Sequence, residues 1–249
     1  MELIHYGEGL RRIFVTYRLP SSKGNIRGVL GMLYRSGFSY TYLKVWTNRI
    51  LPRLLRRRGL PTGVADFARL LGSDVPVDSV DSVNRPEVVE RIRTIEPDYL
   101  VSFSATQRFK DPLIETPRIA TVNVHYGALP AYAGLSPYFW HLYNQEPEFG
   151  VTLHKIVSKL DAGPIIEQTR QTTAGVHTCL GLSLRMAECV SPLLCRLFSG
   201  ETNVANAVSQ PATERSYFRH PARKQVKEVR RNGFDILDSD SKRNLLRAA

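Results

Sequence analysis

The sequence contains few cysteines, and their spacing is not that of a metal site. Only Cys179, Cys189 and Cys195 occur among 249 residues. They fall in a segment with helical periodicity rather than in the paired arrangement typical of zinc ligands or of a disulfide framework. We therefore expect no zinc site and no disulfide, and we interpret the three thiols as small buried hydrophobic groups.

Long hydrophobic runs are also missing. No apolar run approaches the roughly 20 residues that a membrane-spanning helix requires. The first residues, Met1 to Gly7, lack the basic start and apolar core of a signal peptide. Internal repeats and low-complexity tracts are absent as well. Because 43% of the residues are hydrophobic, we expect a globular, cytoplasmic protein.

Acidic residues are scarce relative to basic ones. The chain has 34 Lys and Arg against 23 Asp and Glu, a formal net charge of +11. Such an excess favours anionic partners, among them phosphates, nucleotides, nucleic acid and membrane headgroups. The charge alone does not choose among these partners.

Strand and helix signals alternate along the chain. Short apolar or alternating runs predict strands over 12–17, 74–77, 97–103, 119–125, 150–157 and 164–169, and helical periodicity predicts helices over 26–58, 88–95, 178–198 and 222–233. We expect Pro192 to kink the helix over 178–198, Gly200 to stop it, and the last dozen residues to be frayed. The alternation predicts an α/β fold with a doubly wound, mostly parallel sheet.

Two segments differ from the rest in composition. Residues 26–60 are aromatic, apolar and basic, and residues 201–249 form a short basic C-terminal extension. We therefore expect a catalytic domain over 1–200 that carries a basic helical insert near 26–60. The insert has two interpretations: a helix packed by its apolar stripe with arginines in water, which we favour, or a segment that lies on a membrane or binds a polyanion.

The stretch from Val122 to Gln168 concentrates polar groups between apolar runs. In a strand over 119–125, Asn123 and His125 project from the same face. Asp161 falls in a tight connection between the two following strands. Alone, His125 is compatible with a structural role and Asp161 with ordinary turn chemistry. Together they provide an amide for a developing oxyanion, a proton carrier and a group that orients it, which suits acyl transfer.

The residues NVHYGALPAYAG, a Pro and a Trp shortly after them, and then GVTLHKIVSKLDAGPII resemble the folate-dependent formyltransferase family. This family includes phosphoribosylglycinamide, methionyl-tRNA and sugar N-formyltransferases. The resemblance implies a Rossmann-like formyltransferase fold, 10-formyltetrahydrofolate as the formyl donor, no metal, and Asn123, His125 and Asp161 as the catalytic residues. His154 is interpreted as a supporting group on its strand rather than as a proton carrier.

The resemblance also assigns residues to ligand binding. For the folate it implies Thr106, Gln107, Arg108, Phe109, Leu129, Pro130, Lys159 and Leu160, and for the acceptor it implies Tyr126, Gly127 and Tyr132. A cis peptide bond is expected at Leu129–Pro130.

The acceptor is less clear, because the sequence departs from the family where an acceptor would bind. The turn over 18–25 lacks the usual glycine-rich pattern, and Lys23 and Gly24 are interpreted as a solvated turn rather than a phosphate site. Ala133 stands where Arg is frequent in the family. We expect a primary amine of a small molecule, such as an amino sugar, with or without a nucleotide, or a biosynthetic intermediate.

Other functions remain open at this point. The C-terminal segment is too short for the second barrel domain of methionyl-tRNA formyltransferases, so tRNA is not expected as the acceptor. A lipid-linked amino sugar fits if residues 40–58 lie on a membrane, which we do not favour. The alternatives are a formyltetrahydrofolate hydrolase and a nonenzymatic RNA- or membrane-binding protein on the same scaffold. Oligomerisation is open.

Overall fold

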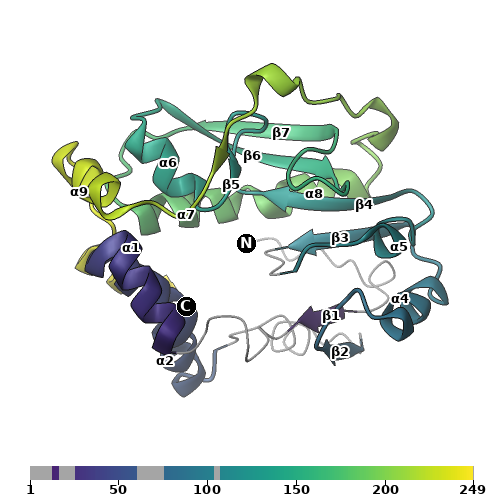
Figure 1. Ribbon diagram of the computed structural model, residues 1–249, viewed down its shortest axis with the longest axis horizontal. Coiled ribbons are helices and arrows are strands. Elements are labelled where there is room, and N and C mark those ends of the chain that lie inside the picture. The colour runs from purple at the N-terminus through teal and green to yellow at the C-terminus, as the bar shows by residue number, and fades with distance from the viewer. Residues whose placement is uncertain (1–12, 17–25, 61–75, 104–106, 249) are drawn as a thin grey trace.

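The computed structural model describes residues 13–16, 26–60, 76–103 and 107–248 (Figure 1). The predicted turn over 18–25, the folate residue Thr106 and the first residues of the predicted strand over 74–77 lie outside these ranges. Within the described residues, this strand comprises Val77–Val80. Pro76 has no N–H to donate to a neighbouring strand.

A four-stranded sheet carries the centre of the molecule. Its strands are β3 (Tyr99–Phe103), β4 (Ala120–His125), β6 (Glu148–Lys155) and β7 (Ile165–Thr172), in the order β3-β4-β6-β7. Strand β3 is parallel to β4, whereas β6 is antiparallel to both β4 and β7. The short connection from β6 to β7 carries Asp161, as the sequence predicted, and such a connection can only join antiparallel strands.

Two further strand pairs are short. β1 (Ile13–Thr16) is parallel to β2 (Val77–Val80), and β5 (Ala133–Gly134) is parallel to β8 (Tyr217–Phe218). Three of the five pairs among the described strands are therefore parallel, and the predicted α/β class with a mostly parallel strand arrangement is confirmed.

The main hydrophobic core lies between the sheet and three helices, α6 (Pro137–Tyr143), α7 (Cys179–Glu188) and α8 (Val190–Phe198). Apolar side chains of β4 and β6 meet apolar side chains of these helices, and each excludes water from the other. The fully buried side chains include Phe139, Leu142, Phe149, Leu153, Leu180, Leu182, Met186, Leu193 and Leu197. A smaller core beneath α4 (Pro86–Arg93) and α5 (Asp111–Ile114) contains Val80, Val83, Val88, Val89, Ile92 and Leu113.

The predicted helix over 178–198 is interrupted within the turn that precedes Pro192. Helix α7 ends at Glu188, Cys189 lies between the two helices, and Pro192 is the third residue of α8. Proline has no N–H to donate to the carbonyl four residues earlier, which is that of Glu188, and its ring crowds that carbonyl. The break therefore lies where the prediction of a kink caused by Pro192 requires it. Gly200 follows α8 with a φ of 80° and ends the helical path, as expected.

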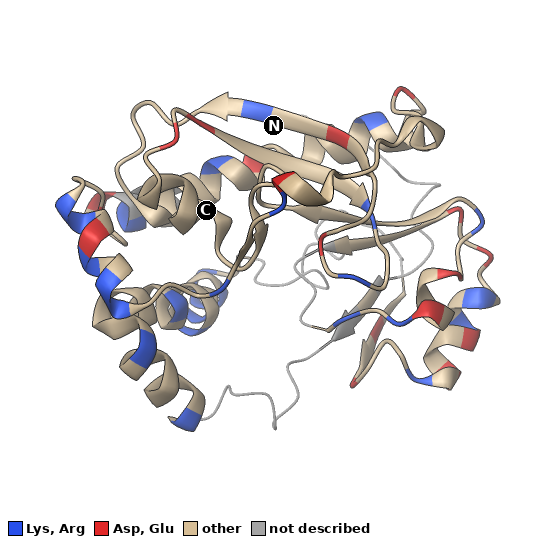
Figure 2. Cartoon of the chain, turned by 45° about the horizontal axis from the view of Figure 1, so that its top comes forward, with Lys and Arg blue, Asp and Glu red and all other residues tan. Residues whose placement is uncertain are grey.

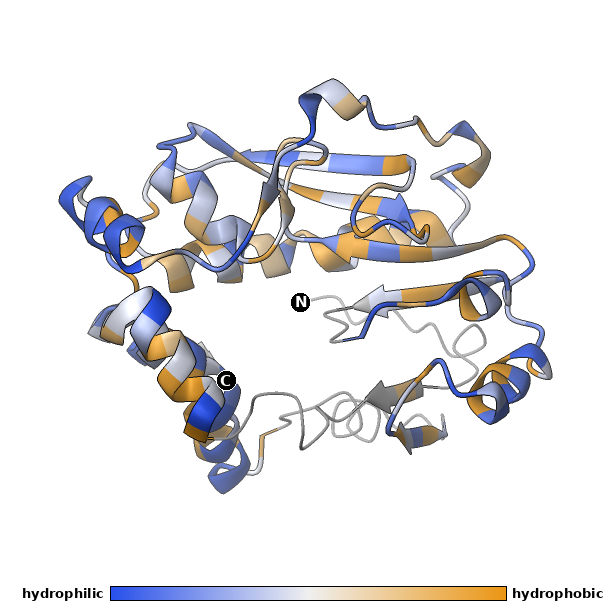
Figure 3. Cartoon of the chain, viewed as in Figure 1, coloured by the Kyte–Doolittle hydropathy of each residue, from blue (hydrophilic) through white to orange (hydrophobic). Residues whose placement is uncertain are grey.

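A group of helices forms the other side of the molecule; we call it the helical lobe. It comprises α1 (Ile26–Val45), the π-helical turn Trp46–Ile50, α2 (Leu51–Arg57), α9 (Arg223–Arg231) and α10 (Ser239–Ala248). In Figure 2 many Lys and Arg lie on these helices, and in Figure 3 hydrophobic and hydrophilic residues mix along α1. The insert is helical, as predicted, and its α1 is kinked at Gly37, where φ is 78°.

The end of the described chain is ordered against this lobe. Residues predicted to be frayed form α10, so that prediction was wrong. Lys242 of α10 lies 5.6 Å above the ring of Tyr42, and Arg58 donates a hydrogen bond to the carbonyl of Leu246. These contacts with the insert, which the sequence pattern does not reveal, hold the last helix. Two 3-10 turns, Val204–Asn206 and Ala212–Glu214, lie between α8 and β8.

Candidate active site

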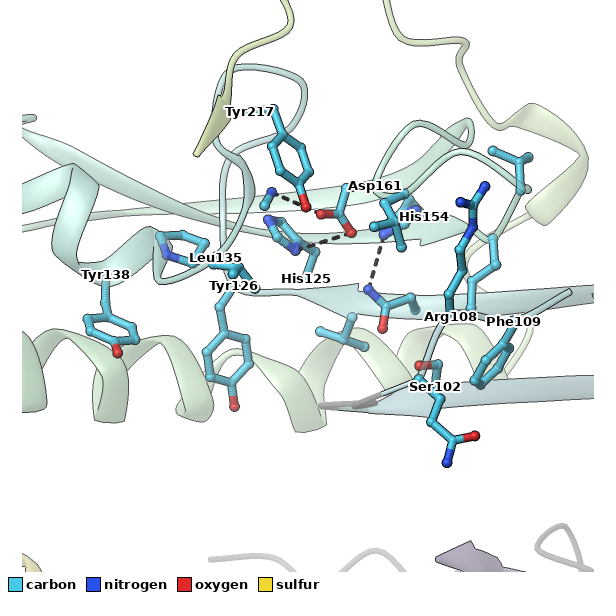
Figure 4. A pocket seen from close by; sticks show the side chains of 18 residues that line it. Ser102, Arg108, Phe109, His125, Tyr126, Leu135, Tyr138, His154, Asp161 and Tyr217 are labelled. Atoms are coloured by element: carbon cyan, nitrogen blue, oxygen red, sulfur yellow. Dashed lines mark hydrogen bonds and ion pairs between the residues drawn. The ribbon is translucent and has the colours of Figure 1, made fainter. Parts of the chain in front are cut away.

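A pocket of about 540 Å³ opens at the carboxyl end of β4 (Figure 4). Eight residues that the sequence assigned to function line it: Gln107, Arg108, Phe109, Asn123, His125, Tyr126, Leu160 and Asp161. Residues from three separate stretches of the chain therefore meet in one place. Ser102, Val124, Gly134, Leu135, Pro137, Tyr138, His154, Ile156, Val157 and Tyr217 complete the lining.

His125 is held in one orientation by two neighbours. Its Nε2 lies 2.8 Å from the carbonyl oxygen of Tyr132, and since a carbonyl only accepts, Nε2 carries the hydrogen. Its Nδ1 faces Oδ1 of Asp161 at 3.7 Å. The other carboxylate oxygen of Asp161 accepts a hydrogen bond of 2.9 Å from the Gly134 backbone N–H. A proton exchanged with a ligand would therefore be carried on Nδ1, where Asp161 stabilises the charged ring.

Asn123 is oriented by His154. The two residues are directly opposite each other on β4 and β6, and the side-chain nitrogen of Asn123 lies 3.1 Å from His154 Nε2. His154 Nδ1 donates to the backbone carbonyl of Lys155 at 2.8 Å, which leaves Nε2 as an acceptor. Burial, and then the nearby His125, lower the pKa of His154 to about 4. The neutral ring therefore fixes the amide of Asn123 with its N–H₂ group toward His154.

The absence of a side chain at Gly127 leaves room for the ring of His125. A Cβ at this position would lie 2.5 Å from the Tyr132 carbonyl oxygen and 2.8 Å from His125 Nε2. Those are the two atoms of the hydrogen bond that orients His125. A side chain at 127 would therefore force that pair apart.

The loop after β4 supports the site from behind. The Leu129–Pro130 peptide bond is cis, which confirms the prediction. Leu129 is buried; its N–H donates to Thr152 Oγ1, and its carbonyl accepts from Gln168 Nε2 at 2.9 Å. Leu129 and Pro130, like Gly127 and Tyr132, are not among the residues that line the pocket. Lys159 is exposed outside it. The ligand-binding roles of these five residues stay predictions, as do those of the assigned residues that line the pocket.

The two ends of the pocket differ in character. Arg108 and Phe109 lie at one end (Figure 4), and Ile156, Val157 and Leu160 add apolar side chains to the lining. Gln107 is held there by its side chain, which accepts from the N–H of Val83 and donates to the carbonyl of Asp81. Arg108 donates to the carbonyl of Ser158 and so joins the loop after β3 to the loop after β6. This end is largely apolar with backbone groups at its edge.

The opposite end is aromatic. Tyr126 and Tyr138 point to one side of β4 in Figure 4, and Tyr217 approaches from β8 beside Asp161. Burial raises the pKa of Tyr126 to about 12, so its phenol stays neutral and can both donate and accept. Lys44 of α1 lies 5.0 Å above the ring of Tyr138. The sequence predicted only Tyr126 here, because nothing in it reveals that β8 pairs with β5 and brings Tyr217 to the site.

The sequence of residues 53–197 matches the formyl transferase family model. This match covers more than half of the chain and includes Asn123, His125 and Asp161. The chain belongs to the formyl transferase family. The α1 helix of this formyltransferase precedes the matched segment, and β8, α9 and α10 follow it.

Solved structures agree on the fold. A methionyl-tRNA formyltransferase from Clostridium thermocellum is 15% identical, with a TM-score of 0.50, over 71% of this chain and 77% of the other. HypX from Aquifex aeolicus in complex with tetrahydrofolic acid is also 15% identical, with a TM-score of 0.50, over 86% of this chain but only 30% of HypX. A Mycobacterium tuberculosis protein, provisionally described as a sugar N-formyltransferase, is 26% identical over 69% and 72% of the two chains, with a TM-score of 0.48. This formyltransferase thus has the α/β formyltransferase fold.

Proposed function

We propose that the protein transfers a formyl group from 10-formyltetrahydrofolate to a primary amine of a small molecule, either an amino sugar or a biosynthetic intermediate. The observation that carries this proposal is the convergence of Asn123, His125 and Asp161 on one pocket, with His125 Nδ1 3.7 Å from the Asp161 carboxylate. An amide, a proton carrier and a carboxylate are the groups that acyl transfer to an amine requires.

The folate is proposed to bind at the apolar end of the pocket. Phe109, Val157 and Leu160 offer flat, apolar surfaces there, and the backbone of the loops after β3 and β6 offers polar groups at the rim. A flat heteroaromatic ring with polar edges suits both features. The shared fold with HypX, whose structure contains tetrahydrofolic acid, supports this choice of donor.

The proposed chemistry follows from which atoms face the cavity. The amine nitrogen attacks the formyl carbon, a new C–N bond forms, and the carbonyl oxygen becomes an oxyanion. The amide of Asn123, fixed by His154, stabilises that oxyanion. His125 Nδ1 takes the proton from the amine and returns it to the folate nitrogen as the old C–N bond breaks, while Asp161 stabilises the charged ring. The products are a formamide and tetrahydrofolate.

The aromatic end of the pocket is proposed to hold the acceptor. Tyr126, Tyr138 and Tyr217 combine flat apolar rings with hydroxyl groups. Such side chains suit a ligand that has one apolar face and several hydroxyls, which favours an amino sugar.

The experiment is to incubate the purified protein with 10-formyltetrahydrofolate and a panel of amines, including amino sugars, nucleotide-linked amino sugars and glycinamide-type intermediates. Mass spectrometry should detect one amine that exchanges a hydrogen for a formyl group, together with stoichiometric tetrahydrofolate. Release of formate in the absence of any amine would instead identify a hydrolase. No turnover of the formyl-folate under any condition would sink both readings.

A further inference from the structure

Large apolar side chains are exposed along one helix of the lobe. In α1, Ile26 is 79% exposed, Leu30 55%, Tyr34 86% and Phe38 73%. Ile26, Leu30 and Tyr34 occur four residues apart, so each follows the last along one side of the helix, and Phe38 is the first residue after the kink at Gly37. Single exposed apolar residues are ordinary, but a row of four that large on one element marks an interaction surface. We call these four residues the apolar row.

The insert that carries the apolar row has charges of one sign. Residues 26–60 contain eight basic residues and no acidic one: Arg27, Arg35, Lys44, Arg49, Arg53, Arg56, Arg57 and Arg58. Arg27 and Arg35 lie on α1 itself and are exposed. The adjacent α9 adds five basic residues against one glutamate. Figure 2 shows these basic residues on the helices of the lobe.

The combination decides what the surface binds. The basic side chains could bind a free nucleic acid, but the apolar row would then stay exposed to water. A polar protein surface would complement neither the apolar row nor the positive charge of the insert. An anionic bilayer meets both, because basic side chains attract the headgroups while apolar side chains enter the interface. We propose that the helical lobe binds the surface of an anionic lipid bilayer, with Ile26, Leu30, Tyr34 and Phe38 inserted among the headgroups.

Binding is to the surface rather than through the membrane. In the part of the chain that the structure describes, no helix is long and apolar enough to cross a bilayer. In the second half of α1, Tyr40 and Leu43 are buried in the main core, together with Trp46 of the π-helical turn that follows. The first half is thus exposed while the second half anchors the helix.

The second half of α1 connects the apolar row to the pocket. The Tyr40 hydroxyl is hydrogen-bonded to Ser136, next to the pocket-lining Leu135 and Pro137, and to His220 Nδ1 at 3.1 Å. Lys44, one turn further on, lies above the pocket-lining Tyr138. A lobe bound to a bilayer would therefore hold the aromatic end of the pocket close to that bilayer. The proposal concerns the lobe and does not depend on the reaction.

The test is flotation of the full chain with vesicles of phosphatidylcholine and phosphatidylglycerol at 7:3, about the anionic content at which basic surfaces bind, and with vesicles of pure phosphatidylcholine. One variant, Leu30→Gln with Tyr34→Gln, removes apolar surface without changing charge. A second, Arg27→Gln with Arg35→Gln, removes charge without touching the row. Val208→Gln is the matched control, since Val208 is 69% exposed but lies outside the lobe.

The wild type and the Val208 variant should float with the anionic vesicles and much less with the neutral ones. The apolar-row variant should lose on the order of tenfold in partitioning, because two inserted side chains are removed. The charge variant should lose severalfold, and added salt should weaken the wild type likewise. Equal partitioning of the wild type and the apolar-row variant overturns the proposal. A wild type that floats with neither kind of vesicle also overturns it. Sedimentation analysis would then show whether the apolar row instead joins two copies of the chain.

Discussion

The carboxyl end of β4 with its adjoining loops, which we call the sheet edge, and the helical lobe use their side chains in opposite ways. At the sheet edge, Asn123, His125 and Asp161 each have a partner within the chain, at distances of 2.8 to 3.7 Å. On the lobe, apolar residues such as Tyr34 face water and the insert carries charges of one sign. The sheet edge lies inside the family match, whereas α1, α9 and α10 lie outside it. The side chains proposed for the reaction are positioned by contacts within the chain. The exposed side chains of the lobe are suited to contact with another surface.

The largest effect is expected from the proposed catalytic residues. His125→Ala removes the proton carrier, and Asp161→Asn keeps an oxygen that can accept from Gly134 but removes the charge opposite His125. Both variants should fold normally and lose roughly 10²- to 10⁴-fold in formyl transfer. Thermal melts and turnover with 10-formyltetrahydrofolate check this. Normal melts with near wild-type turnover would remove these residues from the mechanism.

A smaller loss is expected from Gly127→Ala. The added methyl group must displace either the Tyr132 carbonyl or the His125 ring. Because a shift of about 1 Å at a reacting group can cost on the order of 10²-fold, turnover should fall by up to that factor while the fold persists. Gly31→Ala is the matched control: nothing lies within 4 Å of the new methyl group, and alanine favours a helix. If both variants kept full turnover, the positioning role of Gly127 would be refuted.

The sheet region should also lose stability in acid through two neutral histidines. Burial lowers the pKa of both His154 and His141 from 6.5 to about 4. Between pH 6.5 and about 4 the unfolded chain binds protons at these histidines that the folded chain does not bind. The free energy of unfolding therefore falls as the pH drops. Above about pH 6.5 these two groups contribute no pH dependence. The slope should be roughly 1.4 kcal/mol per pH unit for each histidine.

The check is denaturant unfolding at several pH values between 7 and 4.5 for the wild type and His141→Gln. His141 donates from Nδ1 to the Pro137 carbonyl, a bond that a glutamine can replace, and its Nε2 has no hydrogen-bond partner among the described residues. The variant should show a shallower decline than the wild type. An unchanged slope would mean that His141 is already protonated in the folded state.

The smallest effect is expected from the lobe. Leu30→Gln with Tyr34→Gln alters two exposed side chains that do not line the pocket. Exposed substitutions usually change stability by no more than about 0.5 kcal/mol. With a water-soluble amine, turnover and melting temperature should therefore match the wild type. A clear loss of turnover would show that the lobe and the sheet edge are coupled more closely than their contacts indicate.

The sequence predicted the local features well because each depends on neighbours in the chain. Alternation in β4 placed Asn123 and His125 on one face, and the turn signals placed Asp161 in a tight connection. Only the family resemblance predicted that Asp161 lies beside His125. The packing of α10 on the insert and the position of Tyr217 at the pocket depend on contacts between distant segments. The bond between His154 and Asn123 is intermediate, since it needs the antiparallel register of β4 and β6, which neither strand reveals alone.

The pairing of β5 with β8 has a consequence for where the functional unit ends. Gly134, whose N–H holds Asp161, lies so close to β8 that a Cβ would come within 2.2 Å of the Phe218 carbonyl. The predicted division at residue 200 would place this strand outside the catalytic domain. A chain shortened to residues 1–200 would keep all three proposed catalytic side chains but lose the strand beside the loop that orients one of them. We therefore expect the minimal unit for the reaction to be larger than the segment that carries its signature.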